Sequence, residues 1–282
     1  MKYTIWVGTA IAALLGVGVM KSFAQPALQV RVQRWLDVRQ ATGSVMMLEN
    51  GNLQPAKVGA RLAGIGDGIE TGSNSTAMLG VDTNVGFVNV SENTSLRIQR
   101  LEIAPDNGRV THLSVTKGQA RLRVRPFTHR GSELKIQTPA GFSGVRGTEF
   151  GLAIQPNGKT GLAVLDGRVN SNAQGKEIPV AKGFQNFTIP GESPSTPVPL
   201  KDDTGLKYEF ERVVERGVRK VRLVGQTDPV NSVIVDGTPR DTDRSGRFTA
   251  DLLPVGTTPA LSFQVTVITP LGKQQVYDLV FR

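Results

Sequence analysis

The most constraining feature of this sequence is a pair of short alternating runs joined by a tight turn, within residues 137–169. Large apolar residues at positions 150, 152 and 154 alternate with small ones, which is the period of a strand with one buried face. Asn157-Gly158 follows, and this dipeptide between two alternating runs predicts a hairpin. The next run alternates in the same way, so the stretch predicts antiparallel β-structure.

Glycines interrupt the same stretch at positions 144, 147 and 151. A glycine within strand and turn sequence indicates either a positive φ or the close approach of another backbone. We therefore expect one or the other at Gly144, Gly147 and Gly151.

Composition supports the same class over the whole chain of 282 residues. Gly (32) and Pro (16) are spread along the sequence, as many short strands with tight turns require, and long helical periodicity is almost absent. Aromatic residues make up only 6%, so the core must be built from Val, Leu, Ile and Ala. There is no Cys, which excludes both disulfides and a lipidated cysteine. The expected class is all-β.

Residues 137–169 resemble the core of the FecR-type domain, which takes its name from the periplasmic part of a bacterial iron-citrate signalling regulator. Segments at 59–72, 77–96 and 113–125 are similar to the same family, and their order along the chain agrees with it. The residues that match the family motif are Thr138, Pro139, Gly144, Arg146, Gly147, Thr148, Glu149, Phe150 and Gly167.

The resemblance implies a stack of short antiparallel hairpins over residues 25–189, rather than a closed barrel. A role in the fold is favoured for the motif residues over a role as a ligand site. Arg146 and Glu149 flank Thr148, and we expect them to form a charge-assisted pair that holds this turn.

The first 24 residues read as a signal peptide. A lysine precedes a continuous apolar stretch, and small residues at Ser22 and Ala24 predict cleavage before Gln25. An uncleaved membrane anchor is the alternative, and it is the one membrane association we expect. Export places the protein in the periplasm or at the cell surface. Because the apolar segment begins almost at Met1, no cytoplasmic anti-sigma segment is expected.

The composition changes beyond Ile189. Residues 190–217 are rich in Pro and Ser at their start, which is typical of an extended linker. Leu206, Phe210 and Val213 or Val214 recur at helical spacing, so a short helix is predicted there, with a strand edge or coil as the alternative. Residues 218–282 alternate again and resemble a bacterial immunoglobulin-like β-sandwich module.

Candidates for catalysis and metal binding are few. The only histidines, His112 and His129, lie in no recognisable zinc spacing, and no nucleophile, carboxylate pair or phosphate loop can be nominated. Asp241 and Asp243 begin a sequence similar to a calcium loop, but Leu252 stands where the closing carboxylate belongs, and a polar turn is favoured. We therefore predict no catalysis, no cofactor and no metal.

Charge gives a stronger indication of what the chain binds. The formal net charge is +9, and the sequence pI is about 10.0. Arg121, Arg123 and Arg125 alternate with apolar residues, so on a strand they share one exposed face. That face is a candidate for binding an anionic ligand; the alternative is a solvated face that prevents edge aggregation. A second basic run comprises Arg216, Arg219, Lys220 and Arg222.

These observations predict a non-catalytic, exported envelope protein that binds a protein partner or an anionic cell-wall or surface polymer. The alternative is a signalling subunit that relays an external cue to a membrane partner. Nucleic acid fits the charge but not the export signal or the shortage of aromatic residues for stacking.

Overall fold

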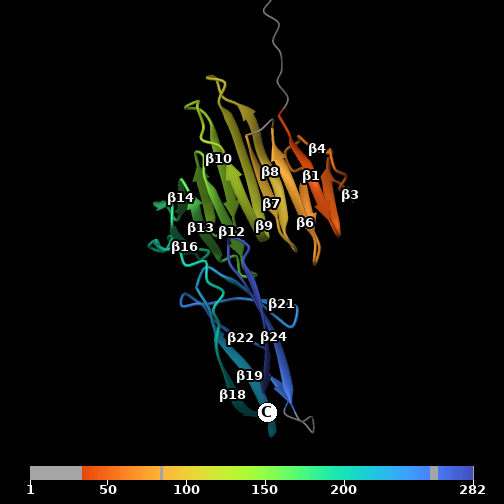
Figure 1. Ribbon diagram of the computed structural model, residues 1–282, viewed down its shortest axis with the longest axis vertical. Helices are drawn as coiled ribbons and strands as arrows, with labels where there is room; N and C mark the ends of the chain where they lie inside the picture. The colour runs from red at the N-terminus through yellow and green to blue at the C-terminus, as the bar shows by residue number, and fades with distance from the viewer. Residues whose placement is uncertain (1–33, 83–84, 255–259, 282) are drawn as a thin grey trace, which may run out of the picture. The chain divides into compact units, whose positions relative to one another are not determined.

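The computed structural model describes residues 34–82, 85–254 and 260–281, and within these ranges the chain contains strands and turns but no helix (Figure 1). The all-β class is thus confirmed. None of the described segments is a helix long and apolar enough to cross a membrane. The predicted signal peptide and its cleavage site lie outside the described residues. All described residues belong to one compact unit, Gln33–Arg282.

Seventeen strands form the N-terminal part of this unit. They are β1 Leu36–Thr42, β2 Val45–Glu49, β3 Asn52–Pro55, β4 Arg61–Leu62, β5 Gly68–Thr71, β6 Thr76–Val81, β7 Gly86–Val90, β8 Ser95–Ile103, β9 Arg109–Val124, β10 Glu133–Thr138, β11 Gly141–Val145, β12 Glu149–Ile154, β13 Thr160–Asp166, β14 Arg168–Ala173, β15 Lys176–Ala181, β16 Phe184–Thr188 and β17 Val198–Pro199.

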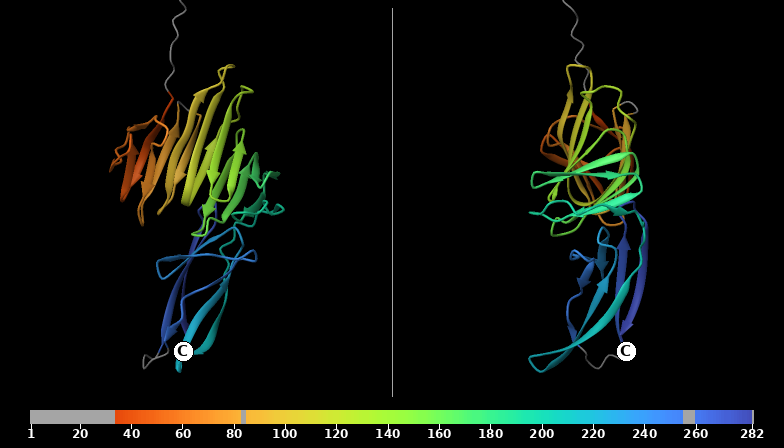
Figure 2. Two further views of the ribbon diagram at one scale, coloured as in Figure 1. Left: turned by 180° about the vertical axis from the view of Figure 1, so that it is seen from behind. Right: turned by 90° about the vertical axis from the view of Figure 1, so that its left-hand side faces the viewer.

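Their pairings define two sheets that share the long strand β9. Sheet 1 follows the order β4-β1-β6-β7-β9-β12-β13-β16-β17. Sheet 2 follows β3-β2-β5-β8-β9-β10-β11-β14-β15. All of these pairs are antiparallel except β9 with β10. The ladders agree with the expected short antiparallel hairpins, and Figure 2 shows the two layers they form.

One aliphatic core fills the space between the two sheets. It draws its buried side chains from both, including Ile98 and Ile136 of sheet 2 and Leu79, Leu122 and Phe150 of sheet 1, all 0% exposed. Phe150 is the only aromatic residue in this buried cluster. The low aromatic content of the sequence therefore reflects a core that is packed from branched aliphatic residues, and burial of this area supplies most of the driving force for folding.

Strands β12 and β13 are buried on both faces, which corrects the prediction of one buried face. The second face is covered by the C-terminal part of the chain at two glycines. A Cβ on Gly151 would lie 2.0 Å from the carbonyl oxygen of Pro270, and one on Gly161 would lie 2.0 Å from that of Val230. Gly151 is thus required for close backbone approach, as expected.

The C-terminal part consists of two small sheets. Its strands are β18 Lys207–Glu215, β19 Val218–Gln226, β20 Ser232–Val235, β21 Thr238–Arg240, β22 Arg247–Thr249, β23 Leu253–Pro254, β24 Leu261–Ile268 and β25 Gln274–Phe281. Sheet 3 follows β18-β19-β22 with β23 also on β19, and sheet 4 follows β21-β20-β24-β25. A second apolar core draws on both sheets. The two sheets enclosing one core agree with a small β-sandwich; the immunoglobulin-like resemblance stays a prediction.

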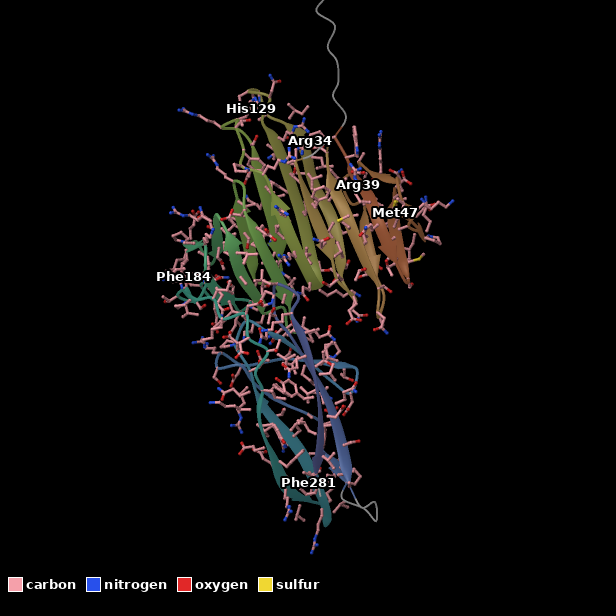
Figure 3. All side chains as sticks on the ribbon, in the orientation of Figure 1. Arg34, Arg39, Met47, His129, Phe184 and Phe281 are labelled. Carbon is pink, nitrogen blue, oxygen red and sulfur yellow. The ribbon has the colours of Figure 1, made fainter. Side chains whose placement is uncertain are left out.

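The predicted short helix before Gly217 is wrong, because β18 occupies those residues and pairs along its whole length with β19. Arg216 and Gly217 both have positive φ (52° and 77°), which is the geometry of a tight hairpin turn and not of a helix end. Phe210 packs against Phe263 and against Phe281, which is labelled in Figure 3, with ring centres 5.7 and 5.4 Å apart. The sandwich core therefore starts before Val218.

Buried polar side chains join the first sheet to the C-terminal sandwich. The side-chain amide of Gln155 donates to the carbonyl oxygen of Asn231 (2.8 Å) and accepts from the backbone N–H of Thr242 (2.8 Å). Lys159 is 0% exposed, and its ammonium donates to Thr242 Oγ1 (2.9 Å). A buried polar group is costly unless it is paired. The burial of Gln155 and Lys159 therefore depends on the hydrogen bonds that the C-terminal sandwich supplies.

Candidate ligand-binding groove

The turn between β11 and β12 explains two of the motif glycines. Gly147 has a φ of 102°, and a Cβ there would lie 2.3 Å from the Cα of Pro126. Gly167 has a φ of 80°, and its Cβ would lie 2.6 Å from the carbonyl oxygen of Gly147. Only glycine fits both positions without strain. This geometry supports the interpretation of these residues as determinants of the fold.

Thr138 and Pro139 of the motif also have structural contacts, and Thr148 is buried. Thr138 is buried and its hydroxyl accepts from Thr160 Oγ1 (3.1 Å). Pro139 lies 2.8 Å from where a Cβ on Gly158 would be, at the β12–β13 turn. The hydroxyl of Thr148 is buried without a hydrogen-bond partner in the described residues.

The expected ion pair between Arg146 and Glu149 does not form. The carboxylate of Glu149 accepts from Arg121 (2.6 Å) and lies 3.8 Å from Nε of Arg123. Arg146 instead donates to the carbonyl oxygen of Arg130 (3.3 Å). The reason is topological: β11 belongs to sheet 2 and β12 to sheet 1, so the chain crosses between layers within this turn and separates the two side chains.

The arginine face predicted on β9 is only partly available to a ligand. Leu122 and Val124 are buried, so the alternation is as expected. However, Glu149 neutralises Arg121 and approaches Arg123, and Arg125 lies beyond the last residue of the strand. Of the three cations, Arg125 alone has no carboxylate partner among the residues that the structure describes. The face is therefore a weaker anion site than its sequence indicates.

In the predicted polar turn near Asp243, the aspartate carboxylates accept hydrogen bonds from backbone N–H groups. Oδ1 of Asp243 accepts from the backbone N–H of Ser245 (2.8 Å) and of Arg247 (2.9 Å), while Oδ1 of Asp241 accepts from Asn157 N–H (2.8 Å). Burial acts to raise the pKa of Asp243, but the hydrogen bonds from Ser245 and Arg247 outweigh it and keep that pKa below its usual value. Over the described ranges, no group of three or more His, Asp or Glu residues is placed to hold a metal ion.

Gly144 differs from the other glycines of its motif. It is the fourth of the five residues of β11 and lies between Lys135 of β10 and Asn170 of β14. Its φ is not in the positive range, and a Cβ there would meet no atom within 4 Å. The expectation of a positive φ or close packing is therefore wrong at this position. Nothing in the backbone requires glycine, although glycine weakens a strand interior.

The missing side chain leaves a groove of about 610 Å³ on the outer face of sheet 2. Four basic residues and only two acidic ones, Glu133 and Glu177, line it. The lining residues used below are Arg130, Lys135, Phe142, Arg146, Arg168 and Asn170. His129, labelled in Figure 3, lies on the loop that leads from β9 to this face.

The acidic residues of the groove have partners already. Glu133 pairs with His112 Nε2 (3.1 Å) and with Lys135 (3.4 Å), and Asn170 donates to Glu177 (2.6 Å). Burial acts to raise the pKa of Glu133, but the hydrogen bond to His112 and the charge of Lys135 prevail and lower it. Glu133 thus stays ionised at neutral pH and offsets one cation.

Three guanidinium groups in the groove remain free of carboxylates. Within the described part of the chain, Arg130, Arg146 and Arg168 make no ion pair with Asp or Glu, and each is exposed. Lys135 lies 4.5 Å from the centre of the Phe142 ring, which holds its ammonium over the groove floor. The arrangement can bind a polymer that carries repeated negative charges, because guanidinium groups pair readily with carboxylate and phosphate oxygens.

The sequence did not indicate this groove as a site. Its residues come from the loop after β9, from β10, β11, β14 and β15, and from the turn after β11. They meet because β11 pairs with β10 on one side and with β14 on the other, and β14 pairs with β15. The available signal was Gly144 itself, a strand glycine without turn chemistry on either side, next to the motif residue Arg146.

Comparisons with known proteins match part of the chain to a family model. Residues 67–170 match the family model described as FecR protein. Two crystal structures, at 2.50 and 1.65 Å resolution and described as a "putative anti-sigma factor" from Parabacteroides distasonis, are 16% identical in sequence, each with a TM-score of 0.39. They cover 52% and 51% of this chain and 68% of their own. None of the curated proteins compared matches the chain.

Proposed function

Because residues 67–170 of this chain match the FecR family model, we propose that the protein is a non-catalytic component of the bacterial envelope that binds an anionic envelope polymer in the groove of sheet 2. The periplasm or the cell surface is the compartment that this proposal requires. A carboxylate-bearing polysaccharide or the peptidoglycan itself has the repeated charge that the groove fits.

A single observation carries the proposal: Gly144 keeps the groove floor open although no backbone constraint demands a glycine there. Arg146 and Arg168 flank that opening without carboxylate partners among the described residues. Glycine weakens a strand and is not required by the backbone at position 144, and the cations beside it are unpaired. Both facts support a role of this position in binding rather than in folding.

Gly144→Gln tests the groove directly. The new side chain projects into the open space and fills the floor, so retention on purified peptidoglycan sacculi or on an acidic polysaccharide is expected to fall about tenfold. Stability should not fall, because a Cβ at this position meets no atom within 4 Å. The measurement is co-sedimentation at low and at physiological salt, together with a thermal unfolding curve. Unchanged retention by a folded variant would rule the groove out.

Two sets of charge variants separate the groove from the β9 face. Arg146→Gln with Arg168→Gln is expected to weaken retention and to reduce its dependence on salt, because exposed charges act through screened electrostatics. The comparison variant changes Arg121, Arg123 and Arg125 to Gln, which removes one more charge than the groove variant does. It should have the smaller effect, since Glu149 already neutralises part of that face. If the Arg121, Arg123 and Arg125 variant loses more retention than the groove variant, the binding site is on the β9 face instead.

The alternative function is a signalling subunit that binds a membrane protein and relays an external cue. The FecR match favours a signalling-related role, and the same envelope location serves it. Cross-linking in a native envelope fraction separates the two functions. The signalling role would be supported if one defined protein is captured, and if its capture persists at high salt and with the Gly144→Gln variant.

A further inference from the structure

The turn of the β18–β19 hairpin combines exposed apolar and basic side chains. Val214 and Val218 flank the turn and are 71% and 46% exposed. Arg216 lies in the turn itself, and Arg219 pairs across from Val214. We refer to residues 214–219 as the hairpin tip. The groove described above does not involve them, so they call for a separate explanation.

The tip lies beyond the strands that support the rest of the hairpin. β22 pairs with β19 only at residues 224–226, and β23 pairs with it only at 220–221. Among the described residues, 218–219 therefore pair with β18 alone. Figure 2 shows the end of this hairpin standing away from the other strands of the sandwich. Within the described residues, the side chains at 214–219 are exposed and can meet a surface.

The hairpin alternation places an apolar side chain on each face of the tip. Directly opposed residues share a face, so Val218 lies beside Glu215, and Val214 lies beside Arg219 on the opposite face. Val214 lies on the same face of β18 as Phe210, which packs against the sandwich core, and lies beyond the end of that core. A single exposed valine is ordinary, but a projecting turn with one on each side exposes apolar area whichever way it faces.

The charges at the tip are arranged so that its end stays positive. Glu215 pairs with Lys220 (2.6 Å), and Arg222 lies 3.6 Å from Glu211. Arg216 and Arg219 form no ion pair with a carboxylate in the described ranges. Arg216 also has a φ of 52°, a conformation that favours Asn or Gly in such turns. Arginine is therefore not the residue that the turn geometry selects.

We propose that the hairpin tip docks on an anionic lipid surface, with Val214 and Val218 entering the headgroup layer and Arg216 and Arg219 pairing with lipid phosphates. Apolar side chains flanked by cations are the combination that binds the interface of an anionic bilayer. A protein partner would need an apolar patch and carboxylates placed to match this tip, whereas an anionic bilayer supplies phosphates and apolar chains without a specific match. A soluble polymer would satisfy the cations but not the valines.

Vesicle co-sedimentation tests the tip with the chain Gln25–Arg282, which retains every described strand and lacks the apolar segment at the N-terminus. We expect binding to vesicles of phosphatidylglycerol mixed with phosphatidylcholine, and little binding to phosphatidylcholine alone. Arg216→Gln with Arg219→Gln should weaken binding about 25-fold, at a factor of about five per arginine. Val214→Ser with Val218→Ser should weaken it about tenfold.

Two matched variants serve as controls. Val276→Ser with Val280→Ser removes two valines of β25 that are each 48% exposed, and it should leave vesicle binding unchanged. Arg146→Gln with Arg168→Gln removes two groove cations and should reduce polymer retention but not vesicle binding. The proposal is overturned if the wild-type chain does not co-sediment with anionic vesicles, or if folded tip variants bind these vesicles as strongly as the wild type does. Loss of polymer retention in the tip variants, without vesicle binding, would assign the tip to the polymer instead.

Discussion

Gly147→Ala is expected to lower the free energy of unfolding by about 3 kcal/mol, or the melting temperature by roughly 6–12 °C. Gly147 has a φ of 102°, which an L-residue adopts only with strain, and its Cβ would lie 2.3 Å from the backbone of Pro126. Backbone cannot move aside as the end of a flexible side chain can. The turn that carries the chain from sheet 2 to sheet 1 must therefore distort.

Gly144→Ala is the matched control in the same motif. Its backbone is not in the positive-φ range and its Cβ meets no atom within 4 Å, so stability should stay constant or rise by a few tenths of a kcal/mol to about 1 kcal/mol. Chemical denaturation of both variants with the same protein concentration provides the comparison. Equal losses at the two positions would show that both glycines are required by the fold, and would remove the main support for the groove.

Replacing Lys159 should change how stability depends on pH. The side chain is 0% exposed, its ammonium donates to Thr242 Oγ1 (2.9 Å) and Asp243 O (2.5 Å), and it lies 4.6 Å from the centre of the Phe187 ring. Burial lowers its pKa from 10.5 to about 8, against the opposing charges of Asp243 and Asp228.

The direction of the effect follows from proton binding. Between pH 8 and pH 10.5 the folded protein has released the lysine proton while the unfolded chain still holds it. The unfolded state then binds more protons, so stability rises with pH across this window. The wild type should gain about 3 kcal/mol relative to Lys159→Met between neutral pH and pH 10.5.

The measurement is urea unfolding of both proteins from pH 7 to pH 10.5. Other lysines and tyrosines also titrate at the alkaline end, but they are common to both chains and cancel in the difference. Methionine matches the length of lysine without its charge. Parallel curves for the two proteins would show that the lysine keeps its ordinary pKa and that its burial is not as described.

The local sequence was sufficient wherever a short-range rule decides the structure. The hairpin at Asn157-Gly158, the positive φ at Gly147 and the alternation of β9 follow from turn chemistry and from the two-residue period of strands. The same rules misled at residues 206–214, where a spacing compatible with a helix was outweighed by nine paired residues of a hairpin with β19. Tertiary pairing overrides weak propensity in such cases.

The candidate site depended on long-range contacts that no local pattern encodes. Arg146 and Glu149 are neighbours in sequence, but the chain changes sheets between them, and Glu149 meets Arg121 instead. The cations of the groove come together because β11 lies between β10 and β14, which is far from it in sequence.

By itself, the sequence determined the all-β class, the turns and the match of residues 67–170 to the FecR family model, because each rests on residues close together in the chain. Only the tertiary structure decided which charges are neutralised and which stay free, because that depends on which strands become neighbours. It also decided that Gly151 is packed against another backbone while Gly144 is not. Both glycines look alike in a strand pattern, and the difference between them is the presence or absence of a partner from a distant part of the chain.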